Sequence, residues 1–275
     1  MTGPWAALRN ARYAAPACVE RIASGPGAEA AARRCLILAR GGIAATVGYF
    51  QSSRARPEEI VEANRAVAAL LAGAGPGVYL SVKAPPLRFD SARLRHVAEG
   101  GLALTFDAHA EKDADRTLAA AADLLDEFPG TGFALPARWR RSAADGARFR
   151  DGSARIRIVK GEWADPGGDV ADVAANYVEL AASLAGRGAP VAVATHDPDL
   201  AERALALLLE AGTPCELEQL RGLPSRRTAA VARRLGVPVR VYVPFGPGWW
   251  PYALDKALAR PYLPAWMIRD RLGRP

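Results

Sequence analysis

Short runs of apolar and β-branched residues alternate along the chain with longer stretches in which apolar residues recur at helical spacing. The stretches 57–73 and 197–212 show this helical period, and the second begins with Asp-Pro and ends at a glycine, as many helices do. Regular alternation of strands and helices predicts parallel strands that are joined by right-handed helical crossovers. The eight predicted strands are 43–50, 78–85, 102–109, 132–138, 154–161, 190–197, 214–222 and 238–246.

Eight such units within about 230 residues match the size of a (βα)8 TIM-like barrel. An open, doubly wound sheet is the alternative, but no Gly-x-Gly-x-x-Gly sequence follows the first predicted strand. No linker-like composition interrupts the pattern, so we expect one barrel domain over residues 41–275. Residues 1–40 are expected to form an additional helical segment that packs on the barrel.

Composition narrows the choice of partners and compartment. The formal net charge is +7, but no basic run contains interleaved aromatic residues, which argues against nucleic-acid binding. The three cysteines are far apart and lack a Cys-x-x-Cys spacing, which argues against a disulfide framework and a structural zinc site. With no signal peptide and no run of about 18 apolar residues, we expect a cytoplasmic protein whose basic charge permits weak, peripheral contact with the inner membrane face.

A barrel of this kind has its active site at the carboxyl ends of the strands and in the loops that follow them. Lys83 and Asp107 follow neighbouring predicted strands and are expected to pair, because a buried lysine is costly without a partner. This pair is either purely structural or orients an anionic substrate. The other polar candidates at strand ends are Tyr49, His109, Arg138, Lys160, Glu162, Trp163, Thr195, His196, Asp197, Glu216, Glu218 and Tyr242.

The segment "RIRIVKGEW" at 155–163 alternates basic and apolar residues. Arg155 and Arg157 share one face of the predicted strand, and Ile156 and Ile158 share the other. Because apolar helices cover the outside of a barrel, at least one arginine is expected to point inward. An inward guanidinium suits an anionic or electron-rich cofactor, and an internal salt bridge is the structural alternative.

His196 has the properties of a general base, a metal ligand or a hydrogen-bonded histidine at a strand end. With only three histidines and no paired-histidine motif, a metal site is not expected. Asp197 precedes a proline and is expected to cap the next helix. These residues leave two functional classes open: a lyase in which Lys83 or Lys160 forms a Schiff base, and a redox enzyme with an anionic cofactor.

Six motifs occur in order between about residue 40 and residue 261: "LSVKAP", "TFDAHA", "RIRIVKGEW", "VATHD", "ELEQLRG" and "VYVPFGPGWWPYALDKALARP". Together they resemble the proline dehydrogenase family of flavoenzymes. The resemblance implies a distorted (βα)8 barrel that carries FAD and oxidises a cyclic secondary amine to an imine. It also implies that the reduced flavin passes its electrons to a quinone or another acceptor.

The resemblance implies a role for individual residues. Asp107 and Arg157 correspond to catalytic residues, with Arg157 beside flavin N5 and Asp107 orienting the lysine that lies near the substrate carboxylate. The positions that correspond to substrate contacts are Lys83, Tyr242, Tyr252, Asp255 and Lys256. The positions that correspond to cofactor contacts are Ala108, Pro136, Arg157, Lys160, Gly161, Glu162, Trp163, Thr195, His196 and Glu216.

The last motif departs from the family at the substrate site. Tyr252, Asp255 and Lys256 are spaced i, i+3 and i+4, so they share one face of the helix predicted from residue 249. The family has an Arg-Arg pair, which holds the proline carboxylate, where this chain has Asp255 and Lys256. Losing one charge-assisted pair costs on the order of 2–3 kcal/mol, so plain proline is expected to bind at least ~100-fold worse.

Other departures agree that the pocket differs. Pro136 and Glu218 replace glutamines, Trp163 replaces a tyrosine, and Asp-Ala-His at 107–109 replaces Asp-x-Glu. We therefore expect an FAD-dependent dehydrogenase that moves hydride from the carbon next to an amine nitrogen to flavin N5. Its expected substrate is a proline-like cyclic amine or a modified amino acid. The alternatives are a non-catalytic barrel that binds a small molecule or partner, and the Schiff-base lyase.

Overall fold

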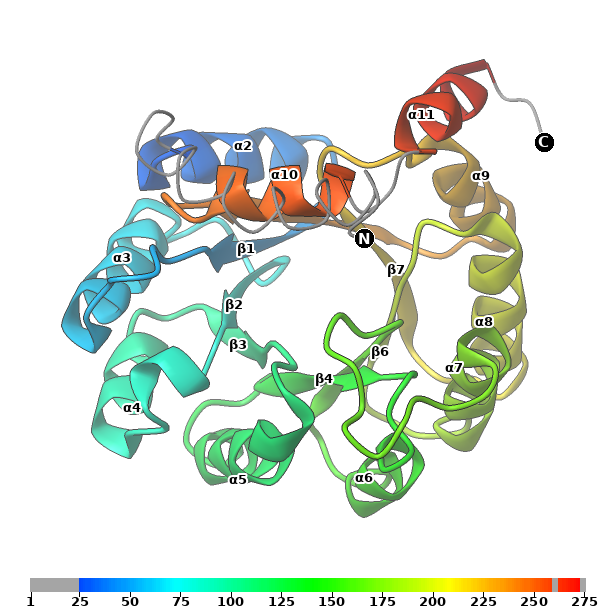
Figure 1. Ribbon diagram of the computed structural model, residues 1–275, viewed down its shortest axis with the longest axis horizontal. Helices are drawn as coiled ribbons and strands as arrows, with labels where there is room; N and C mark the ends of the chain where they lie inside the picture. Colours follow the sequence, from blue (N-terminus) through cyan, green and yellow to red (C-terminus); the bar gives the residue numbers. More distant parts are fainter. Residues whose placement is uncertain (1–24, 259–261, 273–275) are drawn as a thin grey trace, which may run out of the picture.

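Eight parallel strands close into a barrel in the computed structural model, which describes residues 25–258 and 262–272. Each strand pairs with the next along the chain, and β8 closes the circle by pairing with β1 (Figure 1). The prediction of a (βα)8 TIM-like barrel is confirmed. The strands are β1 (Ala44–Tyr49), β2 (Val78–Val82), β3 (Ala103–Phe106), β4 (Gly132–Pro136), β5 (Arg155–Val159), β6 (Val191–Ala194), β7 (Cys215–Leu220) and β8 (Val239–Phe245).

Every strand lies within one of the predicted runs but ends earlier at its carboxyl end. β2 ends at Val82 and β3 at Phe106, whereas the predicted runs continue to residues 85 and 109. The predicted runs include the first residues of the following loops, which include polar residues and lie at the barrel mouth. Lys83 and Asp107 therefore lie directly after the ends of two neighbouring strands.

Helices connect successive strands and form the outer ring of Figure 1. Helices are confirmed in 57–73 and 197–212, and the Asp197 carboxylate caps the second of these by accepting from the Leu200 amide at 3.2 Å. The helices are α2 (Ala28–Arg40), α3 (Pro57–Leu70), α4 (Ser91–Ala98), α5 (Ala114–Leu125), α6 (Ser142–Arg148), α7 (Val173–Ser183), α8 (Pro198–Glu210), α9 (Arg226–Leu235), α10 (Trp249–Leu258) and α11 (Leu263–Leu272), with 3-10 turns η1 (Pro85–Leu87) and η2 (Glu111–Asp113).

Two helices pack near β1, one from each end of the chain. α2 packs against β1, β8 and α3 and buries Cys35 and Leu38. It belongs to the helical segment expected over 1–40, of which residues 1–24 lie outside the described residues. α10 begins where the Gly248 amide donates to the Phe50 carbonyl at 2.9 Å. In the described part of the chain, every helix is too short or too polar to cross a bilayer.

Charged side chains occupy the interior of the barrel. Arg155 and Arg157 both point inward from β5, while Ile156 and Ile158 are buried on the opposite face. This confirms the expectation that at least one arginine faces inward. The interior of a TIM barrel is usually packed with branched apolar residues, so charged groups there require partners.

The lower part of the interior is a set of paired charges. Arg155 and Arg240 share the carboxylate of Glu216, and both guanidinium groups lie over the Tyr79 ring, at 4.9 and 4.0 Å from its centroid. Arg155 also donates to Glu218, nearer the barrel mouth, at 2.9 Å. These pairs compensate the buried charges and provide a fixed base for the residues above them.

Candidate active site at the barrel mouth

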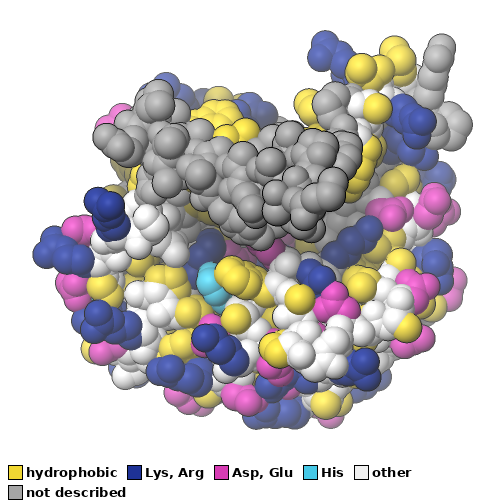
Figure 2. All heavy atoms as spheres, viewed as in Figure 1, with side chains coloured by type: hydrophobic (Ala, Val, Ile, Leu, Met, Phe, Trp, Pro, Cys, Tyr) yellow, Lys and Arg dark blue, Asp and Glu magenta, His cyan; other side chains and the backbone are white. Residues whose placement is uncertain are grey.

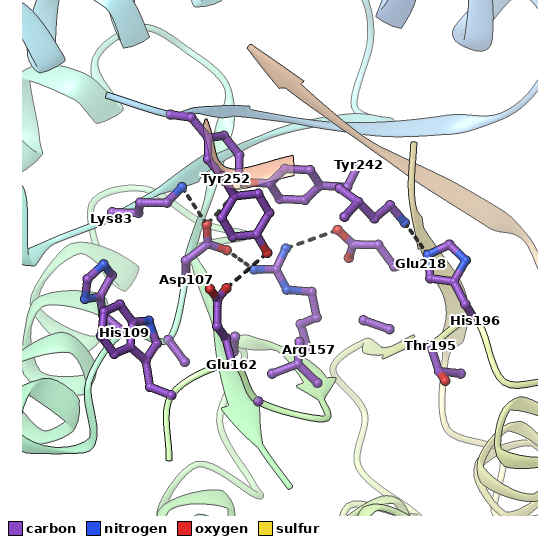
Figure 3. Close-up of a pocket in the computed structure, with 18 of the residues that line it drawn as sticks. Lys83, Asp107, His109, Arg157, Glu162, Thr195, His196, Glu218, Tyr242 and Tyr252 are labelled. Carbon is purple, nitrogen blue, oxygen red and sulfur yellow. Dashed lines mark hydrogen bonds and ion pairs between the residues drawn. The ribbon is translucent and has the colours of Figure 1, made fainter. Parts of the chain in front are cut away.

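A cavity of about 450 Å³ lies at the carboxyl ends of the strands. Its size falls within the range of small-molecule sites, about 300–1,000 Å³. Figure 3 shows charged and aromatic side chains from several strands around this space. The candidate residues that line it are Lys83, Asp107, Ala108, His109, Arg157, Gly161, Glu162, Trp163, Thr195, His196, Glu218, Tyr242 and Tyr252. The barrel thus brings together most of the candidates from the sequence.

Asp107 is the centre of the hydrogen-bond network in this cavity (Figure 3). Its Oδ1 accepts from the Ser81 hydroxyl at 2.7 Å and from Arg157 Nη2, and its Oδ2 accepts from Lys83 Nζ at 3.1 Å and from the Tyr242 hydroxyl at 3.2 Å. Burial alone would raise the pKa of Asp107, but the charges of Lys83 and Arg157 outweigh it and hold the pKa well below its usual value. Asp107 therefore positions its neighbours and stays ionised at neutral pH. Its expected pairing with Lys83 is present.

Arg157 lies between two carboxylates. Its Nη1 donates to Glu218 at 3.1 Å and its Nη2 donates to Asp107. Only 4% of the side chain is exposed, and its Nε has no hydrogen-bond partner among the described residues. Burial would lower the pKa of Arg157, but Glu218 and Asp107 raise it above its ordinary value. The guanidinium is therefore always charged, and Arg157 is one of the residues that line the cavity.

Aromatic rings form one side of the site. The ring of Phe50 lies 5.2 Å from that of Trp249, 4.9 Å from Tyr252 and 6.5 Å from Tyr242, between centroids. Gly48, on β1, makes room for the Tyr242 ring, because a Cβ there would lie only 1.9 Å from the Tyr242 hydroxyl. The small residue thus lets the phenol reach Asp107.

The loop after β5 forms the outer rim of the cavity. The Tyr252 hydroxyl, from α10, donates to Glu162 Oε2 at 3.0 Å, and the His109 ring packs against Trp163 with centroids 4.9 Å apart. Burial and then the charge of Lys83 lower the pKa of His109, so its imidazole is neutral at pH 7. Contacts from α10 and from the loop after β3 therefore hold this rim in place.

Both ring nitrogens of His196 are hydrogen-bonded to backbone groups. Its Nδ1 lies 2.6 Å from the Pro224 carbonyl oxygen, and its Nε2 lies 2.9 Å from the Leu220 amide nitrogen. Because the carbonyl can only accept and the amide can only donate, the neutral tautomer with its proton on Nδ1 satisfies both. Among the roles considered from the sequence, this geometry favours a hydrogen-bonded strand-end histidine over a general base.

A second cavity, of about 1250 Å³, adjoins the first and shares Gly161, Thr195 and Tyr252 with it. Its charged lining residues are Arg138, Lys160, Arg221, Arg227, Arg269, Glu162 and Asp197. Its large aromatic lining residues are Trp249, Trp250, Tyr252, Tyr262 and Trp266. Basic groups exceed acidic ones in this lining, which favours an anionic ligand. Over the face viewed in Figure 2, by contrast, Lys and Arg side chains are interspersed with Asp and Glu.

Three predicted cofactor contacts lie away from the smaller cavity. The Lys160 side chain is 50% exposed, pairs with Asp197 at 3.4 Å and lines only the larger cavity. Pro136 is buried in β4, and Glu216 belongs to the ion pairs of the lower interior. Neither Pro136 nor Glu216 is among the described lining residues of either cavity.

Two predicted substrate contacts are not described in full. Asp255 and Lys256 belong to α10, but their side chains lie outside the described residues, as do those of Leu258 and Pro264. The Tyr252 side chain, one turn earlier on the same helix, does line the cavity. The placement of Asp255 and Lys256 at the substrate stays a prediction.

Sequence reasoning missed Phe50 and Ser81. Ser81 lies two residues before Lys83, so strand alternation could have placed both on the inward face. The sequence indicates Tyr49 as the candidate at the end of β1, but its ring packs against that of Phe245, with centroids 5.2 Å apart. Phe50, the next residue, lines the cavity instead. Gly48 faces inward from β1, so the alternation of side chains along the strand also places Phe50, two residues later, toward the cavity.

Neither candidate lysine has the surroundings of a Schiff-base lysine, whose amine is typically desolvated in a hydrophobic pocket or beside another cation. Lys83 donates to the carboxylate of Asp107, and Lys160 is half exposed and pairs with Asp197. The geometry therefore favours the redox class over the lyase class.

Comparison with known proteins supports the same class. No family model matches the chain. Proline dehydrogenase 1 of Bacillus subtilis (strain 168) is 25% identical over 274 residues, which cover 92% of this chain and 90% of the relative. The proline dehydrogenase of Deinococcus radiodurans is 27% identical over 278 residues, which cover 92% and 89%.

A solved structure shows a similar fold. Proline utilization A (PutA) of Bdellovibrio bacteriovorus superposes with a TM-score of 0.74 at 18% identity, over 90% of this chain. The chain spans about one third of that PutA, 33% of its length, so this similarity concerns one part of a larger protein. This similarity shows the fold, and the curated proline dehydrogenases are similar to this chain in sequence over nearly its whole length, in agreement with the motifs.

Proposed function

We propose that this protein is an FAD-dependent dehydrogenase that transfers hydride from the carbon next to an amine nitrogen to flavin N5, which gives an imine. The observation that supports this most directly is Arg157, a buried and permanently charged residue that lines the cavity between two carboxylates. The curated relatives are named proline dehydrogenases, which agrees with this chemistry. Bound FAD would supply the redox chemistry, and the protein supplies orientation and charge.

The described residues fit FAD in shape and charge. The smaller cavity offers Arg157 to an electron-rich ring system. The described lining of the larger cavity has five basic side chains against two acidic ones, a balance that suits a diphosphate. Trp249 in the larger cavity suits stacking with an adenine. Gly161, with φ of +94°, adopts a left-handed conformation, and a Cβ there would lie 2.8 Å from the Arg138 side chain, so glycine lets this loop between the two cavities pack against Arg138.

Arg157 is the residue that we assign to the reactive edge of the ring. Asp107 and Glu218 hold its guanidinium from two sides, so it needs little reorganisation when negative charge develops nearby. Burial and then Asp107 raise the pKa of Tyr242 well above its usual value, so its hydroxyl remains a donor to Asp107. This network fixes the position of the charge, and no member of it is required to exchange a proton.

The charges in the pocket support a substrate other than plain proline, a proline-like cyclic amine or a modified amino acid. Among the described lining residues, both basic side chains already contact carboxylates: Lys83 contacts Asp107, and Arg157 contacts Asp107 and Glu218. Lys83 also donates to a backbone carbonyl at 3.2 Å and lies 4.2 Å over an aromatic ring. Glu162 adds a further carboxylate at the rim. A substrate carboxylate would compete with these pairs, whereas a cationic or neutral amine would not.

A flavin-reduction screen tests this proposal. The protein is loaded with FAD, made anaerobic, and mixed with cyclic amines that carry or lack a carboxylate. Reduction of the flavin is followed as loss of absorbance at about 450 nm. We expect reduction by an amine that lacks the proline carboxylate or carries an additional cationic group, and slow reduction by proline. Fast reduction by proline would contradict the substrate assignment. FAD binding without reduction by any amine would favour a non-catalytic barrel instead.

An electron acceptor must reoxidise the cofactor. We propose a quinone or another small acceptor, and weak contact with the inner membrane face would bring a quinone close. The net charge of +7 supports attraction to an anionic membrane surface. Sedimentation with anionic vesicles, compared with neutral ones, measures this contact, and equal binding to both would contradict it.

A further inference from the structure

Glu218 places a second carboxylate against the arginine of the cavity. It faces into the barrel from β7, lines the cavity, and has only 2% of its side chain exposed. Its Oε1 accepts from Arg157 Nη1 at 3.1 Å, and its Oε2 accepts from Arg155 Nη2 at 2.9 Å. Asp107 accepts from the other terminal nitrogen of Arg157. The guanidinium of Arg157 is therefore in direct contact with two carboxylates.

Arg157 is assigned to stabilise negative charge, yet it is in contact with two carboxylates, which is an unusual environment for such a residue. Burial would raise the pKa of Glu218, but Arg157, Arg155 and Arg240 outweigh it and lower that pKa to about 2. Asp107 is held ionised in the same way, so both partners of Arg157 are charged at neutral pH. Because the side chains of Arg157 and Glu218 are only 4% and 2% exposed, two carboxylates in contact offset most of the positive potential of one guanidinium.

We infer that Glu218 tunes the reduction potential of the bound flavin, holding it more negative than Arg157 would give with a neutral residue at position 218. This role rests on the FAD-binding function proposed above. With FAD bound, hydride transfer would bring two electrons and one proton to the ring, would leave the amine donor as an iminium ion, and would add one negative charge to the ring. Arg157 stabilises that charge, and Glu218 opposes it by neutralising the guanidinium. Glu218 is thus a positioning and tuning residue that acts through Arg157.

The test compares FAD-loaded wild type with the isosteric variant Glu218→Gln, which removes the charge and keeps the shape. Sulfite is the probe: it forms a bond to flavin N5 and leaves a negative charge on the ring, so its dissociation constant reports the local potential. We expect sulfite to bind about tenfold tighter or more to the variant. For a two-electron couple, a tenfold change corresponds to a rise of about 30 mV in midpoint potential, which spectroelectrochemistry measures directly.

Two matched variants separate charge from structure. Glu218→Asp keeps the negative charge, so its sulfite affinity and potential should stay close to wild type even if its fold loosens. Glu216→Gln removes a partly buried carboxylate that pairs with Arg155 and Arg240 but does not contact Arg157 and does not line the described cavities. It should therefore change the potential much less than Glu218→Gln.

Each outcome decides the question. A wild-type protein that binds no FAD would overturn the proposed function and this inference together. If FAD binds but Glu218→Gln changes sulfite affinity by less than about twofold, the proposed function stands and the inference fails. The inference also fails if Glu216→Gln or Glu218→Asp shifts the potential as much as Glu218→Gln does.

Discussion

Replacing Asp107 with asparagine removes a negative charge from the point where four donors converge. In the wild type its two oxygens accept from Ser81, Arg157, Lys83 and Tyr242. The variant leaves two cations without this partner and turns an amide group toward one of the donors. Removing one partner of a buried pair costs 3–5 kcal/mol, and because the cavity admits water we expect about 3 kcal/mol. That is a large share of a typical stability of about 5–15 kcal/mol.

Urea unfolding of the cofactor-free protein at pH 7 measures this loss as a lower midpoint at unchanged slope. The pKa of Asp107 lies well below its ordinary value of 3.8, so its contribution is complete above that value and is lost as the pH falls through the folded pKa. The gap between wild type and Asp107→Asn should stay constant down to about pH 5 and narrow only below about pH 4.

An exposed pair provides the control for this experiment. Glu59 pairs with Arg56 on the surface, where the two side chains are 48% and 74% exposed. Surface pairs contribute little, so Glu59→Gln should leave the urea midpoint nearly unchanged. If Asp107→Asn loses no more stability than Glu59→Gln, the network at Asp107 does not hold the barrel mouth together and our reasoning is refuted.

Three further predictions concern the support of the site. Gly48→Ala should cost about 1–3 kcal/mol of unfolding free energy, because its Cβ would lie 1.9 Å from the Tyr242 hydroxyl; an unchanged midpoint would contradict this. His196→Ala should cost about 1–3 kcal/mol and speed hydrogen exchange at the Leu220 amide, and wild-type exchange there would show that the bond is unimportant. The pKa of the His109 ring, measured by NMR, should lie below 6.5, because burial disfavours the charged form. The free energy of unfolding should therefore fall as the pH drops from 6.5 through that pKa. A titration midpoint of the ring at or above 6.5 would contradict this.

The barrel could be predicted because its signals are local. Each strand has a short apolar run, each crossover has a helical period, and Asp197 marks the start of α8. Strand ends could not be placed, because strand pairing stops where the barrel opens and no single residue type marks that point in the sequence. The predicted run 102–109 therefore extends past Phe106, the last residue of β3, into the mouth.

The site could be predicted in part, for a related reason. Alternation in β5 was enough to place at least one of its arginines inward, and neighbouring strand ends were enough to pair Lys83 with Asp107. The contact of Arg157 with Glu218 joins residues 61 positions apart, on strands that are not neighbours in the barrel. This contact forms only because the diameter of the barrel and the stagger of its strands bring the two side chains together, and no short sequence pattern encodes that geometry.

A titration of the protein with FAD would show whether the two adjoining cavities hold the cofactor. Ala194 lines both cavities where they meet, so Ala194→Phe would place a ring in the path between them. We predict saturable binding of one FAD per wild-type chain and strongly weakened binding to Ala194→Phe. No binding to the wild type, or equal binding to the variant, would contradict the account.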